Sequence, residues 1–167
     1  KLFVASNPKN GVGSTVFSVV RYGNVMGSRG SIIPYLISLR DSGRFPITDP
    51  RMTRFMITLK DAVDLVWLAF DEMVGGEIFV KKIPSMNIME IAKAVSLDTK
   101  HDIIGIRTGE KLHEQMIGLE DADFTFEYDG HYRILPNIHG WARDPNRIGN
   151  GVKVDPNFSY QSDLNQE

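Results

Sequence analysis

The feature that most constrains the fold is a repeated alternation of two hydrophobic patterns along the chain. Runs rich in β-branched and aromatic residues predict strands, as in "STVFSVVRYGNV" (residues 14–25) and "EIFVKK" (residues 77–82). The stretches between such runs carry apolar residues three and four positions apart, which predicts amphipathic helices. Strands that alternate with helices along a chain predict an α/β fold.

The other elements follow from the same two patterns and from turn residues. Further strands are predicted at residues 44–49, 53–58, 102–107 and 123–129. Helices are predicted at residues 1–6, 32–43, 59–74, 88–95 and 109–116. The first of these helices is closed by a turn at residues 7–13. Ser31 is placed to cap the helix at 32–43, and Gly43 is placed to end it.

Two of the helices have a well-defined apolar face. On the helix that follows Thr58 and Asp61, a pair with the spacing of a capping box, this face carries Val63, Val66, Trp67 and Phe70. On the helix that starts at Asn87, the residues expected to point inward are Ile88, Ile91, Ala92 and Val95.

Composition excludes several classes of protein. The net charge is −2, so there is no bulk positive field to attract nucleic acid or an acidic membrane. No apolar run approaches the roughly 18 residues that span a bilayer. Cysteine is absent, which excludes disulfides and thiolate metal sites and suits a reducing cytosol. The chain starts without Met and both ends look cut, so we expect it to be a piece of a longer protein.

A glycine-rich polar turn, "GNVMGSRGS" (residues 23–31), lies between a predicted strand and a predicted helix. Free backbone N–H groups at such a place favour an anion. Asn24 can donate its amide to a phosphate, and Arg29 can add charge. An ordinary turn rich in left-handed glycine explains the same residues.

Two arginines lie close to predicted strands. Arg54 stands in an apolar strand pattern, where a guanidinium needs an anionic partner. Arg107 ends another predicted strand and is followed by Glu110. Together they can clamp a diphosphate while the carboxylate binds a sugar hydroxyl. The alternatives are a salt bridge to a nearby Asp for Arg54 and a surface ion pair for Arg107.

Other chemical motifs are missing from the sequence. No G-x-G-x-x-G follows a strand, and no G-x-S-x-G elbow is present. "KLHEQMIG" (residues 111–118) begins like a zinc-binding H-E-x-x-H helix, but Ile117 stands at the second His position. We therefore predict no metal site.

Five segments in order resemble one family, over residues 1 to about 163. They are "KLF" (1–3), "FSVVRYGNVMGSRGSIIP" (17–34), "FPITDPRMTRFMITLKDAV" (45–63), "GEIFVKKIPSMNI" (76–88) and "GIRTGEKLHE" (105–114). The chain resembles the C-terminal part of extended short-chain dehydrogenases/reductases that act on nucleotide sugars. In particular it is similar to the inverting UDP-N-acetylglucosamine 4,6-dehydratases of bacterial surface-polysaccharide pathways. With this resemblance, the anion-binding interpretation of residues 23–31 prevails over the plain turn.

The resemblance implies roles for individual residues. The residues whose backbone is expected to lie beside the nicotinamide of a bound cofactor are Tyr22, Gly23, Asn24 and Val25. Those around the uridine are Ser31, Ile32, Pro46 and Thr48. Arg54 and Arg107 match the diphosphate clamp, to which Asn24 adds a phosphate contact. Glu110 matches a contact to the ribose hydroxyl. The family usually has Pro where this chain has Thr108, which loosens that turn but leaves Arg107 in place.

The resemblance also implies an organisation and an activity. Residues 1–167 form one fragment, in which the last elements of a Rossmann-type dinucleotide-binding domain interleave with a smaller α/β substrate subdomain. The glycine fingerprint and the catalytic Tyr-x-x-x-Lys pair lie upstream in the family. Lys1 aligns beyond that lysine, so we predict no catalytic residue in this chain and no activity for the chain alone.

The parent enzyme is expected to use NADP or NAD to oxidise the sugar at C4. Water is then lost across C5 and C6, and C6 is reduced with inversion at C5, which makes the enzyme a lyase. We expect it to be a cytoplasmic homo-oligomer that binds a UDP-sugar, with no nucleic acid partner and no membrane insertion. The alternatives are a UDP-sugar 4-epimerase and a non-catalytic module that binds a sugar nucleotide or assembles a complex.

Overall fold

The computed structural model describes residues 2–7, 15–138 and 140–165 of the chain. The chain forms two compact units, and each takes its residues from three separate segments. Unit 1 comprises residues 1–22, 60–82 and 116–160, and unit 2 comprises residues 23–59, 83–115 and 161–167. The assignment of these units to a cofactor domain and a substrate subdomain remains a prediction.

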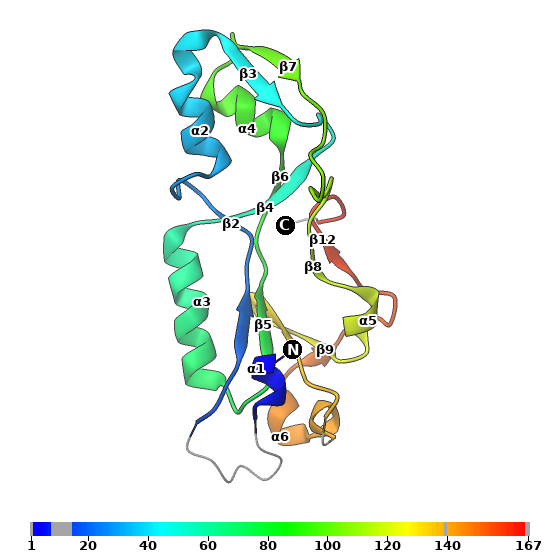
Figure 1. Cartoon of the computed structure of the whole chain (residues 1–167). Helices are drawn as coiled ribbons and strands as arrows, with labels where there is room; N and C mark the ends of the chain where they lie inside the picture. The colour runs from blue at the N-terminus through cyan, green and yellow to red at the C-terminus, as the bar shows by residue number, and fades with distance from the viewer. Residues whose placement is uncertain (1, 8–14, 139, 166–167) are drawn as a thin grey trace. The chain divides into compact units, whose positions relative to one another are not determined.

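Unit 1 is built on a five-stranded sheet with the order β1-β5-β10-β9-β11, of which Figure 1 labels β5 and β9. Its strands are β1 (Val19–Arg21), β5 (Ile78–Lys81), β9 (Thr125–Tyr128), β10 (His131–Ile134) and β11 (Val152–Lys153). β1 and β5 pair in parallel, and the other pairs are antiparallel. A parallel pair needs a crossover connection. Within unit 1, helix α3 (Leu59–Glu72) leads into β5 and packs against this pair through Leu65, which lies in one cluster with Phe79 and Val20.

The buried face of α3 differs from the predicted one. The buried residues are Ala62, Leu65 and Ala69. Trp67 and Phe70, which were expected on the packed face, are 63% and 60% exposed. The prediction was wrong because α3 has apolar residues on more than one face, and spacing alone does not say which of them meets the sheet. The small Ala62 and Ala69 let the helix backbone lie close to its neighbours.

Short elements complete unit 1. They are α1 (Leu2–Ala5), α5 (Leu119–Ala122), the 3-10 helix η2 (Trp141–Arg143) and α6 (Pro145–Ile148). α1 confirms helix in the first segment, whereas most of the turn predicted after it, residues 8–14, lies outside the described residues. Glu77 is 2% exposed and holds the turn between α3 and β5: its carboxylate accepts the N–H of Gly75 at 2.7 Å and pairs with Arg147 at 3.0 Å.

Unit 2 is organised around two small sheets. β2 (Asn24–Val25), β4 (Thr53–Ile57) and β6 (Ser85–Asn87) form one, and β3 (Arg44–Ile47) with β7 (Lys100–Ile103) forms the other. β2 runs parallel to β4, and β3 runs parallel to β7. The helical elements are α2 (Ile32–Ser38), the 3-10 helix η1 (Arg40–Ser42) and α4 (Ile88–Val95).

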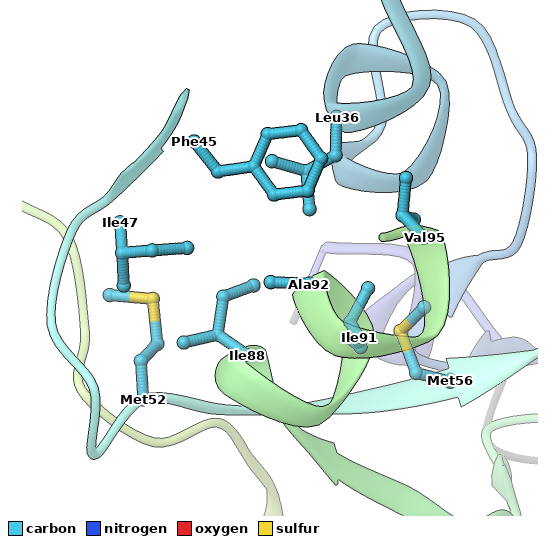
Figure 2. Close-up of a cluster of buried hydrophobic side chains, with 9 residues drawn as sticks. All are labelled: Leu36, Phe45, Ile47, Met52, Met56, Ile88, Ile91, Ala92 and Val95. Atoms are coloured by element: carbon cyan, nitrogen blue, oxygen red, sulfur yellow. The ribbon is translucent and has the colours of Figure 1, made fainter. Parts of the chain in front are cut away.

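Figure 2 shows the core of unit 2, where side chains from α2, β3, β4 and α4 meet. Its buried members are Leu36, Phe45, Ile47, Met52, Met56, Ile88, Ile91, Ala92 and Val95. All the residues of α4 that were predicted to point inward belong to this cluster, which confirms that helix and its register. The Asn87 side chain caps α4 by accepting the N–H of Met89 at 2.7 Å.

Three sequence predictions need correction in this region. The long strand predicted at 14–25 is two strands, because β1 ends at Arg21 in unit 1 and β2 begins at Asn24 in unit 2. The strand predicted at 102–107 ends at Ile103 as β7. The helix predicted at 109–116 does not form: residues 104–114 contain no helix or strand. Gly105 and Gly109 there adopt left-handed φ angles of 84° and 82°, which interrupt both patterns.

The helix predicted at 32–43 is also divided, into α2 and η1, and Gly43 ends it as expected, with φ 67°. Strands β8 (Gln115–Ile117) and β12 (Tyr160–Gln161) form a separate two-stranded sheet. None of the helices in the described residues combines the length and the apolar character needed to cross a membrane.

Candidate functional site

Unit 2 contains a cavity of about 430 Å³. The residues that line it are Asn24, Gly30, Ile32, Tyr35, Pro46, Thr48, Met52, Arg54, Ile88, Ile104, Arg107 and Glu110. Every residue predicted to bind substrate is among them except Ser31. Segments as far apart in sequence as 24 and 110 therefore meet at one place. Pockets for small molecules usually have about 300–1,000 Å³, so the cavity is large enough for a nucleotide.

The cavity combines an apolar wall with a polar wall. Ile32 and Tyr35 come from α2, Pro46 from β3 and Ile88 from the start of α4. The polar part of the lining consists of two guanidinium groups, a carboxylate, a carboxamide and a hydroxyl. These groups belong to Arg54, Arg107, Glu110, Asn24 and Thr48. A few polar groups on an otherwise apolar lining are typical of a site that orients a small ligand.

Arg54 is held almost entirely by backbone carbonyls. Its Nη1 donates to the carbonyl of Thr53 at 2.7 Å and to that of Leu112 at 3.1 Å. Its Nη2 donates to the carbonyl of Lys111 at 2.9 Å. Only 13% of the side chain is exposed. Most of its donors are thus occupied, and the guanidinium stands as a fixed positive charge at the cavity wall.

Two carboxylates balance this charge. Glu110 Oε1 lies 3.8 Å from Arg54 Nη2, and Glu114 Oε1 lies 3.6 Å from Arg54 Nε. The alternative considered for Arg54 was a salt bridge to an Asp, and the acidic partners are glutamates instead. Glu114 also accepts the N–H of Phe55 through Oε2 at 3.3 Å, which ties it to strand β4.

Arg107 is different from Arg54. It lies in the loop after β7 and not at the end of a strand, which corrects the prediction. Its backbone N–H donates to Glu110 Oε2 at 3.2 Å. Its guanidinium makes no hydrogen bond or ion pair with any residue in the described ranges, so the surface ion pair considered as an alternative is not formed there. As far as the described residues go, the guanidinium donors of Arg107 are available to a ligand, while its backbone N–H is engaged by Glu110.

Asn24 and Thr48 also present open polar groups. Asn24 pairs with Met56 through the β2–β4 ladder, which fixes its backbone. Within residues 2–7, 15–138 and 140–165, neither its carboxamide nor the Thr48 hydroxyl has a hydrogen-bond partner. The Asn24 side chain therefore does not serve the backbone of this turn.

Ser31 takes the N-cap position of α2, but its hydroxyl makes no cap hydrogen bond. The Ser31 Oγ atom is buried and has no partner in the described part of the chain, while its neighbours Gly30 and Ile32 line the cavity. Its role toward a uridine remains a prediction.

The residues predicted to pass a nicotinamide do not line the cavity, apart from Asn24. Tyr22 is 42% exposed. A Cβ atom at Gly23 would lie 2.4 Å from the Cβ and carbonyl oxygen of Phe55, so close packing against β4 explains this glycine. Val25 pairs with Ile57 in the ladder. Contact of these residues with a cofactor remains a prediction.

A second cavity, of about 400 Å³, lies in unit 1. Several of its polar groups serve one another: Arg133 pairs with Glu72, stacks 4.2 Å from the Tyr128 ring centroid and donates to His131 Nε2 at 3.1 Å. Burial lowers the pKa of His131 and raises the pKa of Tyr128 to about 12, so both are neutral near pH 7. Since these groups already have partners, the candidate site is the cavity of unit 2.

Residues 1–136 match the polysaccharide biosynthesis protein family. The chain belongs to this family. It is 49% identical over 172 aligned positions to the UDP-N-acetylglucosamine 4,6-dehydratase (inverting) of Campylobacter jejuni subsp. jejuni serotype O:2, covering 99% of this chain and 52% of the relative. It is 43% identical to the UDP-glucose 4-epimerase of Rickettsia massiliae over 139 positions, 80% of this chain and 41% of the relative.

A solved structure agrees with the predicted fold. The X-ray structure of Pen from Bacillus thuringiensis superposes with a TM-score of 0.86 at 29% identity, covering 98% of this chain and 50% of that one. The predicted fold class, α/β of the Rossmann-type extended dehydrogenase/reductase kind, is confirmed. The chain spans about half the length of the curated relatives that it matches.

Some residues of the cavity in this family member were not predicted from the sequence. Tyr35 lies one turn after Ile32 on α2, so helical spacing was a usable signal for it. No such signal existed for Glu114 or Met52. Only the tertiary structure brings Glu114 to Arg54 and Met52 to the cavity. In the described part of the chain, no group of His, Cys, Asp or Glu residues can hold a metal ion.

Proposed function

We propose that this chain is the nucleotide-sugar-binding part of a UDP-N-acetylglucosamine 4,6-dehydratase. The observation that carries the proposal is the cavity of unit 2, where two guanidinium groups, an apolar wall and a carboxamide with no hydrogen-bond partner in the described residues meet. The 49% identity to the Campylobacter jejuni enzyme supports the choice of reaction. The whole enzyme would oxidise the sugar at C4, eliminate water across C5 and C6, and reduce C6 with inversion at C5.

Each wall of the cavity has a part in holding UDP. Arg107, whose guanidinium has no partner among the described residues, binds the diphosphate through two N–H groups, and the fixed charge of Arg54 stabilises the same anion. Asn24 donates its amide to a phosphate oxygen. Glu110 accepts a hydrogen bond from a ribose hydroxyl. Ile32 and Pro46 bury the apolar faces of the uracil and ribose.

Binding of the UDP group has a consequence for catalysis. The diphosphate and uridine do not react, but the free energy of their binding can hold the sugar in the orientation that the reaction needs. Two guanidinium groups supply the positive charge for the diphosphate without a metal ion.

A nicotinamide cofactor, NADP or NAD, supplies the hydride chemistry in the proposed enzyme. The residues of this chain fit a role beside it, because Tyr22 is exposed and the Asn24 carboxamide has no partner in the described ranges. These residues would orient the cofactor. A cytoplasmic location and a homo-oligomeric parent protein remain predictions from the resemblance.

A UDP-sugar 4-epimerase is the second candidate, favoured by the 43% identity to the Rickettsia massiliae protein over 80% of this chain. An epimerase and a dehydratase can share every UDP contact described above. They differ in their products, since only a dehydratase loses water.

The test is to incubate the full-length protein with UDP-N-acetylglucosamine and follow the sugar by proton NMR. A dehydratase converts the C6 hydroxymethyl group to a methyl group and yields a 4-keto-6-deoxy sugar, and inversion at C5 incorporates a solvent proton there. An epimerase yields the C4 epimer with C6 unchanged. Binding of UDP without either product would identify a non-catalytic module, and absence of UDP binding would overturn the proposal.

A further inference from the structure

A chain of hydrogen bonds lies behind Arg54 in unit 2. The Thr53 hydroxyl contacts His113 Nδ1 at 2.7 Å on one side and Ser162 Oγ at 2.7 Å on the other. Ser162 Oγ also accepts the backbone N–H of Glu114 at 2.9 Å. At the far end, His113 Nε2 lies 4.0 Å from Asp163. We call Thr53, His113, Ser162 and Asp163 the hydroxyl network.

The hydroxyl network joins the two backbone segments that hold Arg54. The Thr53 carbonyl accepts a hydrogen bond from Arg54. The backbone N–H of Thr53 donates to the carbonyl of Leu112, which also accepts a hydrogen bond from Arg54. On the other segment, Glu114 pairs with Arg54 Nε. Ser162 bonds to both segments at once, although it lies far from them in sequence.

Burial supports a role in precise placement. Ser162 is 3% exposed, so its hydroxyl cannot exchange these partners for water without local opening. The network thus sets the relative position of the start of β4 and residues 111–114, whereas the fold of unit 2 rests mainly on the apolar core.

We propose that Thr53 and Ser162 are positioning residues for Arg54, and through it determine the affinity of the cavity for a nucleoside diphosphate. The proposal rests on the proposed function. Arg54 has few free donors, so it acts on the diphosphate mainly as a charge in a fixed place. When the network is broken, the carbonyls that hold Arg54 can move apart, and the charge is no longer held at the cavity wall.

The test compares Thr53→Val with Thr53→Ser in the full-length protein. Valine has the shape of threonine without the hydroxyl, and serine retains the hydroxyl. We expect Thr53→Val to weaken UDP binding by about 5- to 20-fold in calorimetry, the size of one or two lost polar contacts. Thr53→Ser should stay within about twofold of the parent. For the UDP-sugar, the loss should appear in KM more than in kcat.

A double-mutant cycle separates positioning from a general structural effect. In an Arg54→Ala background, Thr53→Val should change UDP affinity by less than about twofold, because the group that it positions is gone. An equal loss in both backgrounds would overturn the proposal, and so would unchanged UDP binding by Thr53→Val.

If Thr53→Val fails to fold in a thermal melt, Ser162→Ala takes its place in the cycle. Failure of both to fold would make the network a determinant of the fold and would also overturn the proposal. If the parent protein itself does not bind UDP, the proposed function fails and not this inference alone.

Discussion

The two arginines of the cavity differ in what surrounds them, and this difference predicts different mutational effects. Arg54 donates to the carbonyls of Thr53, Leu112 and Lys111, while Arg107 has no side-chain partner in the described residues. The sequence suggested a diphosphate clamp formed by both arginines. The structure instead gives one guanidinium that belongs to the fold and one that is open to a ligand.

Arg107→Ala in the full-length protein should weaken UDP binding by about 1.5–3 kcal/mol, the usual size of a charge-assisted contact, and leave the free energy of unfolding within about 0.5 kcal/mol of the parent.

Arg54→Ala should weaken UDP binding and also lower the free energy of unfolding by about 1–3 kcal/mol, because the substitution leaves the carbonyls that Arg54 binds without their donor. Calorimetry and chemical denaturation measure the two quantities. Arg51→Ala is the control, since the Arg51 side chain is 72% exposed and, in the described part of the chain, pairs with Asp49 alone. Unchanged affinity in both Arg54→Ala and Arg107→Ala would refute the clamp.

Asn24→Ala should affect substrate handling more than folding. In the described part of the chain its carboxamide has no hydrogen-bond partner, so removing it strands no group. The free energy of unfolding should change by less than about 0.5 kcal/mol, while KM for the UDP-sugar rises. Denaturation and steady-state kinetics on the same preparation test both parts. A loss of about 1 kcal/mol or more in stability with unaltered kinetics would make Asn24 a scaffold residue.

At the scale of elements, helix α4 shows how a local signal and a packed face agree. Its cap residue, Asn87, accepts the N–H of Met89 at 2.7 Å and donates to the carbonyl of Pro50 at 2.9 Å. Its apolar spacing matches its buried face, as predicted. Capping and packing both act on the segment that carries Ile88 into the cavity wall.

Asn87→Ala should therefore lower the free energy of unfolding by about 1 kcal/mol, the usual cost of losing an N-cap. Lys93→Ala, on the exposed face of the same helix, should change it by less than about 0.5 kcal/mol. Urea denaturation monitored by circular dichroism gives both values. Equal effects of the two substitutions would show that the cap does not stabilise α4.

Elements that depend on non-local contacts were predicted less well. The apolar face of α3 was placed on Trp67 and Phe70, and the structure buries Leu65 instead. The strand predicted across residue 22 is interrupted because Gly23 packs directly against Phe55. The short helical pattern at 109–116 gives way to a loop that presents Glu110 and surrounds Arg54. In the first two cases the deciding contact lies far away in the sequence, whereas at 109–116 the left-handed Gly105 and Gly109 interrupt the pattern locally.

At the scale of the whole molecule, the two units have separate cores and separate cavities. The chain spans about half of its curated relatives, and its sequence contains no G-x-G-x-x-G after a strand. The groups that bind a dinucleotide and carry out acid-base chemistry are therefore predicted to lie outside it.

Residues 1–167 expressed alone should show no dehydratase activity and no stoichiometric nicotinamide cofactor. The first part is measured by NMR detection of a 4-keto-6-deoxy sugar, and the second by absorbance of the released cofactor. The full-length protein assayed in parallel is the control. Product from residues 1–167 above a no-protein blank would contradict the prediction and place catalytic groups in this chain.

The sequence by itself determined the α/β class, the strands β3, β4 and β5, the helix α4 with its buried face, and most of the cavity residues. These depend on local periodicity, on turn residues and on motifs that keep their order along the chain. Only the tertiary structure decided which face of α3 is buried, that Arg54 is held by carbonyls while Arg107 is open, and that Ser162 joins the segments behind the cavity. The physical reason is that burial and hydrogen-bond partners are set by residues distant in sequence, and a one-dimensional pattern does not contain their positions.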